Sequence, residues 1–203
     1  MANHLHLGDL PAGLDFGSTV AVDSEAMGLR HGRDRLCVVQ LSAGDGDAHL
    51  VQIRNGVEPK RLKALLEDAR VQKLFHFARF DIALFRHDLG VDTRPLYCTK
   101  IASRLARTYT DRHGLKDLCR ELIGVEISKQ QQSSDWGADE LTDAQIEYAA
   151  ADVLYLHRLR DALDRMLERE GRTALAKACF DFLPHRAALD LAGWPEEDIF
   201  AHA

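Results

Sequence analysis

Residues 19–30 read TVAVDSEAMGLR, a run of small and β-branched side chains that leads into two acidic residues. Side chains of this kind favour β-strands, so we expect a buried strand here. Residues two apart on a strand point to the same side, with Cα atoms roughly 6.5 Å apart. Asp23 and Glu25 should therefore share one face with Ala21, whereas Ser24 faces the other way.

Two carboxylates in so small a volume repel each other, and burial makes their charged forms still less stable. A divalent cation reverses that balance, because Mg²⁺ and Mn²⁺ prefer hard oxygen ligands. The alternative is that the strand simply ends here and both acids face water. An isolated D-x-E motif does not decide between the two.

Strand-like runs and turn signals surround this stretch. Residues 35–44 and 48–56 give two further strands, joined by the turn sequence GDGD, which predicts an antiparallel meander. A short strand follows at 71–77, and the rest of the chain has helical periodicity. Helices are expected over 58–70, 78–90, 99–109, 114–124, 142–169 and 172–190. This order predicts an α/β fold with one mixed sheet and a helical C-terminal half.

Bulk composition narrows the class of protein. A chain of 203 residues with 46% hydrophobic residues supports one domain, with a core at about 10–170 and a helical tail at 171–203. No apolar run approaches the ~20 residues of a membrane helix, and the N-terminus lacks a signal-peptide pattern. The four cysteines are widely spaced, so we expect a reduced, cytoplasmic protein. His4 and His6 resemble a metal pair only superficially, and we treat that region as a tail.

The net charge limits how the chain can contact nucleic acid. Proteins that hold long nucleic acid nonspecifically usually carry net positive charge or a basic stripe. The formal net charge here is -6. Any contact with nucleic acid should therefore be local, in a pocket that touches few phosphates.

Further acidic residues stand at the starts and on the faces of predicted helices. Asp81 falls in the first turn of a helix that follows an apolar strand, where an acid also suits the helix dipole. Tyr148 and Asp152 are separated by four residues, so they are neighbours on one helix surface. Three alanines at 149–151 leave room for a ligand to approach. The alternative for this pair is a solvated Tyr–Asp contact.

Taken together, the acids occur in the order D-x-E, D, Y-x-x-x-D, which resembles the DEDD superfamily of 3′-5′ exonucleases in its tyrosine-bearing, ribonuclease D-like branch. HFARFD at 76–81 is similar to that family's His-x-x-x-x-Asp motif. SDWGADELTDAQIEYAAADVLYL at 134–156 is similar to its Ser-Asp-Trp…Tyr-Ala-Ala-x-Asp block. The resemblance spans about residues 15 to 165. The stretch HGLKDLCRELIGVEISKQQQSSDW at 113–136 most resembles the short, ring-forming nanoRNase C group.

The resemblance implies a ribonuclease H-like sheet and two divalent ions, Mg²⁺ or Mn²⁺. By this resemblance Asp23, Glu25 and Asp152 hold the ion that activates water. Asp23 bridges to the second ion, and Asp81 acts through bound water. Tyr148 is implied to orient the attacking water. The implied activity is a 3′-5′ exoribonuclease that hydrolyses short single-stranded RNA to mononucleotides, and the implied assembly is a homo-octamer.

Substrate contacts are expected in the segment that follows Glu25. Gly28 permits close approach of a ligand, and Met27 or Leu29 could insert between bases. The alternative for Met27 and Leu29 is ordinary core packing.

Other candidate contacts lie near predicted helix starts. His76 and Phe77 precede Asp81, and Phe77 could stack on a base, although packing beneath the helix is an equal alternative. Arg112 and His113 come just before a helix and could bind phosphate; the alternative is a solvated basic turn. The candidate substrate-binding residues are thus Met27, Gly28, Leu29, His76, Phe77, Arg112 and His113.

Three alternatives remain open from the sequence. The first two are trimming of structured RNA in the manner of ribonuclease D and exonuclease action on DNA. The third is a nuclease fold kept only to bind nucleic acid. The apolar tail residues could dock on another subunit or fold back on their own domain; they are Phe182, Leu183, Trp194, Ile199 and Phe200.

Overall fold

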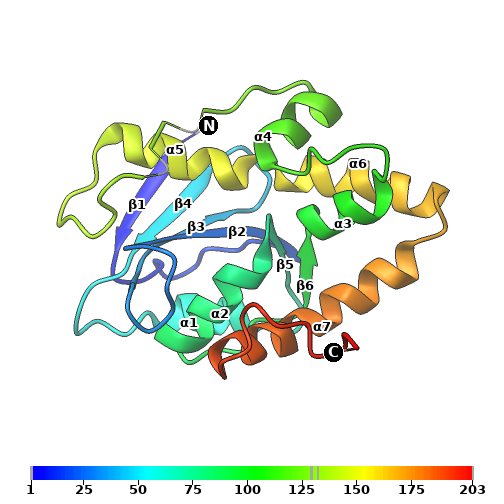
Figure 1. Cartoon of the computed structure of the whole chain (residues 1–203). Coiled ribbons are helices and arrows are strands. Elements are labelled where there is room, and N and C mark those ends of the chain that lie inside the picture. The colour runs from blue at the N-terminus through cyan, green and yellow to red at the C-terminus, as the bar shows by residue number, and fades with distance from the viewer. Residues whose placement is uncertain (1, 129, 132, 203) are drawn as a thin grey trace.

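Figure 1 shows the computed structural model, in which helices cover both faces of a six-stranded sheet. The structure describes residues 2–128, 130, 131 and 133–202. The strands lie in the order β1-β4-β3-β2-β5-β6. Their bounds are β1 (Asn3–Leu7), β2 (Thr19–Ala26), β3 (Leu36–Ser42), β4 (Ala48–Gln52), β5 (Gln72–Phe75) and β6 (Leu96–Cys98). The predicted mixed sheet flanked by helices is confirmed.

The predicted meander forms the centre of the sheet. β2 pairs with β3 and β3 with β4, both antiparallel, whereas β5 runs parallel to β2 and β6 parallel to β5. β3 is buried along its whole length, because helices pack on both faces of the sheet. This arrangement brings the C-terminal ends of β2, β5 and β6 to the same edge, where side chains that follow these strands can meet.

The helices are α1 (Lys60–Glu67), α2 (Ala78–Asp88), α3 (Thr99–Ala106), α4 (Leu115–Leu118), α5 (Asp143–Leu154), α6 (Leu156–Arg169) and α7 (Thr173–Leu191), with a π-helical turn η1 (Cys119–Ile123) after α4. In Figure 1, α5 and α6 run along one side of the sheet, and α1, α2 and α7 lie on the other. Among the described residues, no helix is both long enough and apolar enough to cross a membrane.

Two helical predictions need correction. The helix expected at 142–169 is divided at Tyr155 into α5 and α6. The division has a packing reason, since α5 lies on β2, β3 and β4 whereas α6 packs on α3 and β5. The helix expected at 114–124 is a four-residue α-helix followed by the π-helical turn, and Gly124 ends it with φ 67°.

Two strands were not predicted. The segment treated as a tail contains β1, which pairs in parallel with β4. β1 is mostly exposed, and its partner is more than 40 residues away, so neither burial nor a hairpin turn marks it in the sequence. β6 has only three residues, which is too short for a periodic signal.

Candidate active site

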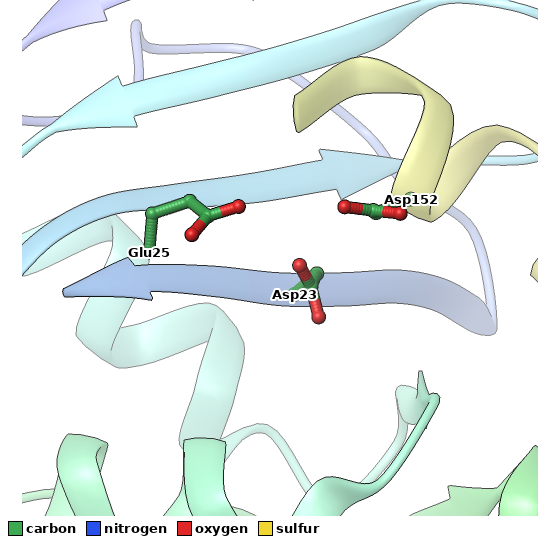
Figure 2. A group of neighbouring side chains, drawn as sticks. All are labelled: Asp23, Glu25 and Asp152. Carbon is green, nitrogen blue, oxygen red and sulfur yellow. The ribbon is translucent and has the colours of Figure 1, made fainter. Parts of the chain in front are cut away.

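The three carboxylates of Asp23, Glu25 and Asp152 converge on one point at the surface of the sheet (Figure 2). One oxygen from each of them lies within 4.8 Å of the others. Asp23 and Glu25 project from the same face of β2, as strand alternation requires. Asp152 comes from the last turn of α5, which crosses above the strand.

Helix α5 carries Asp152 to this position through its cap and its small residues. Thr142 caps the helix, and its hydroxyl accepts a hydrogen bond from the Gln145 N–H, so the two residues form a capping box. Ala149 and Ala150 are buried against the sheet. Small side chains at this contact let the helix approach closely enough for Asp152 to reach β2.

Tyr148 lies one turn before Asp152 on α5, and its hydroxyl is hydrogen-bonded to the Asp152 carboxylate. The ring of the buried Trp136 packs at 6.1 Å from the Tyr148 ring, centroid to centroid. Trp136 thus anchors the phenol.

Asp81 lies beside this group but not within it. Its side chain is only 3% exposed, and it accepts a hydrogen bond of 2.6 Å from the Ser24 hydroxyl. The pairing of β2 with β5 ends at Ala21, so the following part of β2 has room for the first turn of α2. Ser24 was not predictable as a site residue, because alternation places it opposite the two acids and gives no sign of a partner.

Burial and mutual repulsion disfavour the ionised forms of these carboxylates. Burial, together with the neighbouring Asp152 and Asp81, raises the pKa of Glu25 to about 9. Burial and the three surrounding carboxylates also hold the pKa of Asp23 well above its usual range. Burial raises the pKa of Asp81 to about 7, although the hydrogen bond from Ser24 opposes this rise.

These residues fit hard divalent cations. The converging donors are all carboxylate oxygens, which suit Mg²⁺ and Mn²⁺ rather than a softer ion. A cation placed between them would also offset the repulsion that raises their pKa values. Asp23, Glu25 and Asp152 are therefore the residues that can hold a metal directly.

The segment after β2 forms a tight loop that holds two apolar side chains in solvent. Met27 is 54% exposed and Leu29 82% exposed, so neither is a core residue. Gly28 is needed for a reason within the protein, because an added Cβ would lie 2.4 Å from an Asp34 carboxylate oxygen. That carboxylate accepts hydrogen bonds from the Arg30 N–H and from the Arg33 side chain. Asp34 thus fills the space that a side chain at position 28 would need, and the contact of Gly28 with a ligand stays a prediction.

His76 and Phe77 lie between β5 and α2. The Nδ1 of His76 is 2.9 Å from the Thr99 hydroxyl, which fixes the ring against the start of α3. Phe77 is 46% exposed and adopts a left-handed conformation with φ 69°, which is rare for a bulky residue. The Lys100 ammonium lies 4.1 Å from the centroid of its ring. Phe77 is therefore held outward rather than packed beneath α2.

Arg112 and His113 contact α3, the loop that follows it and η1. The Nδ1 of His113 is 2.8 Å from the Ser103 hydroxyl, and the Arg112 carbonyl accepts a hydrogen bond from Arg107. The Arg112 guanidinium is 3.9 Å from the Glu121 carboxylate. These contacts support the alternative of a basic turn, and α4 is too short to offer a helix N-terminus to a phosphate.

Comparison with known families and curated proteins gives one consistent match. The sequence pattern of a domain family described as 3'-5' exonuclease matches residues 7–168. Ribonuclease D of Gluconacetobacter diazotrophicus is 37% identical over 153 residues, which make up 75% of this chain and 39% of that protein. The chain spans less than half the length of the ribonuclease D relatives that it matches.

Solved structures include relatives that match over the whole chain. NrnC of Brucella melitensis has a TM-score of 0.96 and 56% identity, covering 100% of both chains. The same protein bound to pGG has a TM-score of 0.95 and 55% identity over 98% of each chain. With bound Mg²⁺ it has a TM-score of 0.95 and 54% identity over 100% of each. Ribonuclease D of Escherichia coli, described as an exoribonuclease involved in structured RNA processing, has a TM-score of 0.75 and 27% identity over 88% of this chain and 48% of that one.

Proposed function

The chain belongs to the 3′-5′ exonuclease family, and from this premise we propose that it hydrolyses short oligoribonucleotides from the 3′ end to mononucleotides. Family membership confirms the resemblance drawn from the acidic motifs. The observation that carries the proposal is the convergence of Asp23, Glu25 and Asp152 within 4.8 Å. Such a group of oxygens suits metal-assisted cleavage of a phosphodiester.

Two divalent ions are part of the proposal. Asp23, Glu25 and Asp152 would hold one, and Asp23 with Asp81 would serve the second. When bound, such ions lower the pKa of water and stabilise the leaving oxygen. The structure of Brucella melitensis NrnC with bound Mg²⁺ supports this assignment of the metal.

Tyr148 orients the attacking water. Burial and the neighbouring acids raise the pKa of its phenol, which keeps the hydroxyl protonated at neutral pH. A protonated phenol donates a hydrogen bond and is a poor general base. Its place next to Asp152 therefore supports an orienting role.

Short substrates are favoured by three observations. The net charge of -6 does not suit a long nucleic-acid track. Three exposed apolar side chains follow the strands that lead to the acidic cluster: Met27 and Leu29 after β2, and Phe77 after β5. They could contact the bases of a terminal nucleotide. A relative matched over 98% of its chain is bound to pGG, a dinucleotide.

A timed digestion tests the proposal. RNAs of two to ten nucleotides and matched DNAs are incubated with the protein at equal concentration, with Mg²⁺ or with EDTA, and the products are resolved by length. We expect dinucleotide RNA to be cleaved fastest and EDTA to abolish cleavage. Asp152→Asn should be inactive, whereas Glu168→Gln, which removes an exposed acid on α6, should match the wild type.

Each other outcome selects another function. Preference for long or structured RNA would indicate ribonuclease D-like trimming, and preference for the DNA series would indicate a DNA exonuclease. Inactivity with Mg²⁺, and again when Mn²⁺ replaces it, would favour a binding module. Assembly is a separate part of the proposal: exposed Trp194, Ile199 and Phe200 could be covered in an octamer, which light scattering with mass determination would detect.

A further inference from the structure

A buried carboxamide lies beside the acidic cluster without a hydrogen-bond partner. Gln40 stands in β3 and has no exposed surface. Among the described residues, neither the amide nitrogen nor the amide oxygen of Gln40 has a partner. Unpaired polar groups are rare in the interior of a protein, because burial removes their hydrogen bonds to water. The metal-free fold therefore leaves the hydrogen-bonding capacity of Gln40 unused.

The pairing of β2 with β3 places Gln40 next to Asp23. The two residues stand directly opposite each other in the antiparallel register. Side chains of opposite residues point to the same face of a sheet, with Cβ atoms about 4.5–5.5 Å apart. Val38 has the matching position opposite Glu25. Of the two β3 residues that face the acids of β2, only Gln40 can donate a hydrogen bond from its side chain.

Helix α5 covers this face of β2 and β3. Its residues Ala149 and Ala150 are buried there, and their side chains offer no hydrogen bond. No surface of Gln40 is open to water. The carboxylate of Asp23 is thus the partner that the strand register brings within reach of the amide.

We propose that Gln40 is a positioning residue of the metal site, whose amide N–H donates to the Asp23 carboxylate when that carboxylate holds metal. The inference rests on the metal-assisted exonuclease proposed above. In the metal-free fold the two side chains are not hydrogen-bonded. A turn about χ3 reorients the Gln40 amide, and this torsion is soft in glutamine. Gln40 acts through Asp23 and contacts neither metal nor RNA.

A hydrogen bond from Gln40 fixes the direction in which Asp23 presents its oxygens. That direction matters because Asp23 is the residue proposed to serve both ions. Carboxylates that bind metal are themselves hydrogen-bonded, and loss of such an outer partner typically lowers metal affinity by about 10–100-fold. The same amide is unpaired in the metal-free fold, where it disfavours folding. Its removal should therefore weaken metal binding and stabilise the metal-free protein.

Gln40→Met tests both effects in the full-length protein, because methionine is similar in length and lacks the amide. Thermal unfolding in EDTA should give a higher Tm than the wild type, since no buried amide is left unpaired. A Mn²⁺ titration, followed by the electron paramagnetic resonance signal of the free ion, should show an affinity at least about 10-fold lower.

Thr93→Val is the matched control. Thr93 is 2% exposed, and its hydroxyl also lacks a partner among the described residues. It precedes β6, at the end of the parallel strands away from the acids. Its replacement should likewise raise Tm in EDTA and should leave Mn²⁺ affinity unchanged.

Gln40→Leu, with a smaller apolar side chain, repeats both measurements in case methionine overfills the site. Unchanged Mn²⁺ affinity in a folded Gln40 variant would overturn the proposal, as would an equal loss in Thr93→Val. A lower Tm in EDTA for both Gln40 variants would show that the amide is already paired without metal, which also overturns it. None of these measurements uses RNA, so a wild type that binds Mn²⁺ but cleaves no RNA would count against the exonuclease alone.

Discussion

Tyr148 is the residue at the site whose role can be separated from metal binding. It donates to Asp152 but offers no carboxylate. Replacement by Phe should lower the rate of dinucleotide cleavage on the order of 10²-fold, the lower end of what a positioned proton donor contributes. Mg²⁺ affinity should stay nearly unchanged, because the three carboxylates remain.

Initial rates and Mg²⁺ titrations of Tyr148→Phe make this measurement. Tyr155→Phe is the matched control, since Tyr155 lies at the end of the same helix α5 and is partly buried. Full activity in Tyr148→Phe would contradict an orienting role, and a large loss of Mg²⁺ affinity would show that the phenol acts on the metal site instead.

Glu25 links the acidic cluster to stability. Its pKa rises from 4.5 in the unfolded chain to about 9 in the metal-free fold, so the folded state binds more protons between these values. Stability therefore falls as pH rises from about 4.5 to about 9. Mg²⁺ should remove most of this slope, because it binds the ionised cluster of the folded state.

Thermal unfolding of the protein in EDTA across pH 5 to 9 checks this prediction. Tm should decrease with pH in EDTA and decrease less with Mg²⁺. Glu25→Gln removes one titrating group and should flatten the EDTA curve, whereas Glu168→Gln should not. A metal-free Tm that rises over this range would show that the cluster is not the dominant titrating group.

Single residues also show what the sequence could predict. Strand alternation was enough to place Asp23 and Glu25 together, and helical spacing was enough for Tyr148 and Asp152. The partner of Asp81 was not predictable, because the bond to Ser24 depends on where β2 loses its pairing with β5. The need for glycine at position 28 was not predictable either, because it comes from the carboxylate of Asp34, six residues later, which the loop folds against Gly28.

At the scale of elements, β5 contains a lysine with no exposed surface. The Lys73 ammonium donates to the carbonyls of Asp68, Val71 and Arg94 at 2.8, 2.8 and 2.6 Å. These carbonyls belong to the turn before β5 and the turn before β6. The Lys73 side chain thus links the turn before β5 to the turn before β6 through carbonyls that belong to no helix or strand.

Lys73→Met keeps the length of the side chain but leaves the carbonyls of Val71 and Arg94 without a donor, whereas the Asp68 carbonyl still accepts from the Val71 N–H. Each unsatisfied buried acceptor costs about 1–3 kcal/mol. Relaxation and water entry will recover part of this, so we expect a loss of about 2–4 kcal/mol in the free energy of unfolding. Urea denaturation measures the loss. Lys63→Met, which removes a lysine from an exposed pair with Glu58, should cost at most about 1 kcal/mol; equal losses in the two variants would contradict the prediction.

Elements with strong local periodicity were predictable, and those that depend on distant partners were not. The meander and α2 followed from alternation and helical spacing. β1 required its pairing with β4, and the break between α5 and α6 required their different packing partners.

At the scale of the whole molecule, hydrogen bonds from two arginines hold the C-terminal segment against α2 and α7. Arg79 on α2 donates to both oxygens of Asp190 at 2.6 and 2.8 Å and also to the Pro195 carbonyl. Arg186 donates to Asp190 and to the Trp194 carbonyl. The sequence left open whether this tail folds back or docks on another subunit, since both bury apolar residues. The carbonyls of Trp194 and Pro195 bind these arginines, so the tail folds back on its own domain. Phe200 nevertheless remains 74% exposed.

Asp190 is central to this contact, because its side chain is 5% exposed and accepts hydrogen bonds from both guanidinium groups. Asp190→Asn keeps the shape but removes the charge that orders Arg79 and Arg186. Breaking a fully buried pair costs about 3–5 kcal/mol, but Arg79 is 36% exposed, so screening by solvent should reduce the loss to about 1–3 kcal/mol.

Hydrogen exchange at 193–202 should accelerate in Asp190→Asn, whereas exchange in β2 and β3 should not, because the core does not depend on the tail. Asp181→Asn, on the same helix in an exposed pair with Lys177, is the matched control. Unchanged exchange in Asp190→Asn would mean that the apolar contacts of the tail, rather than the two arginines, hold it against α2.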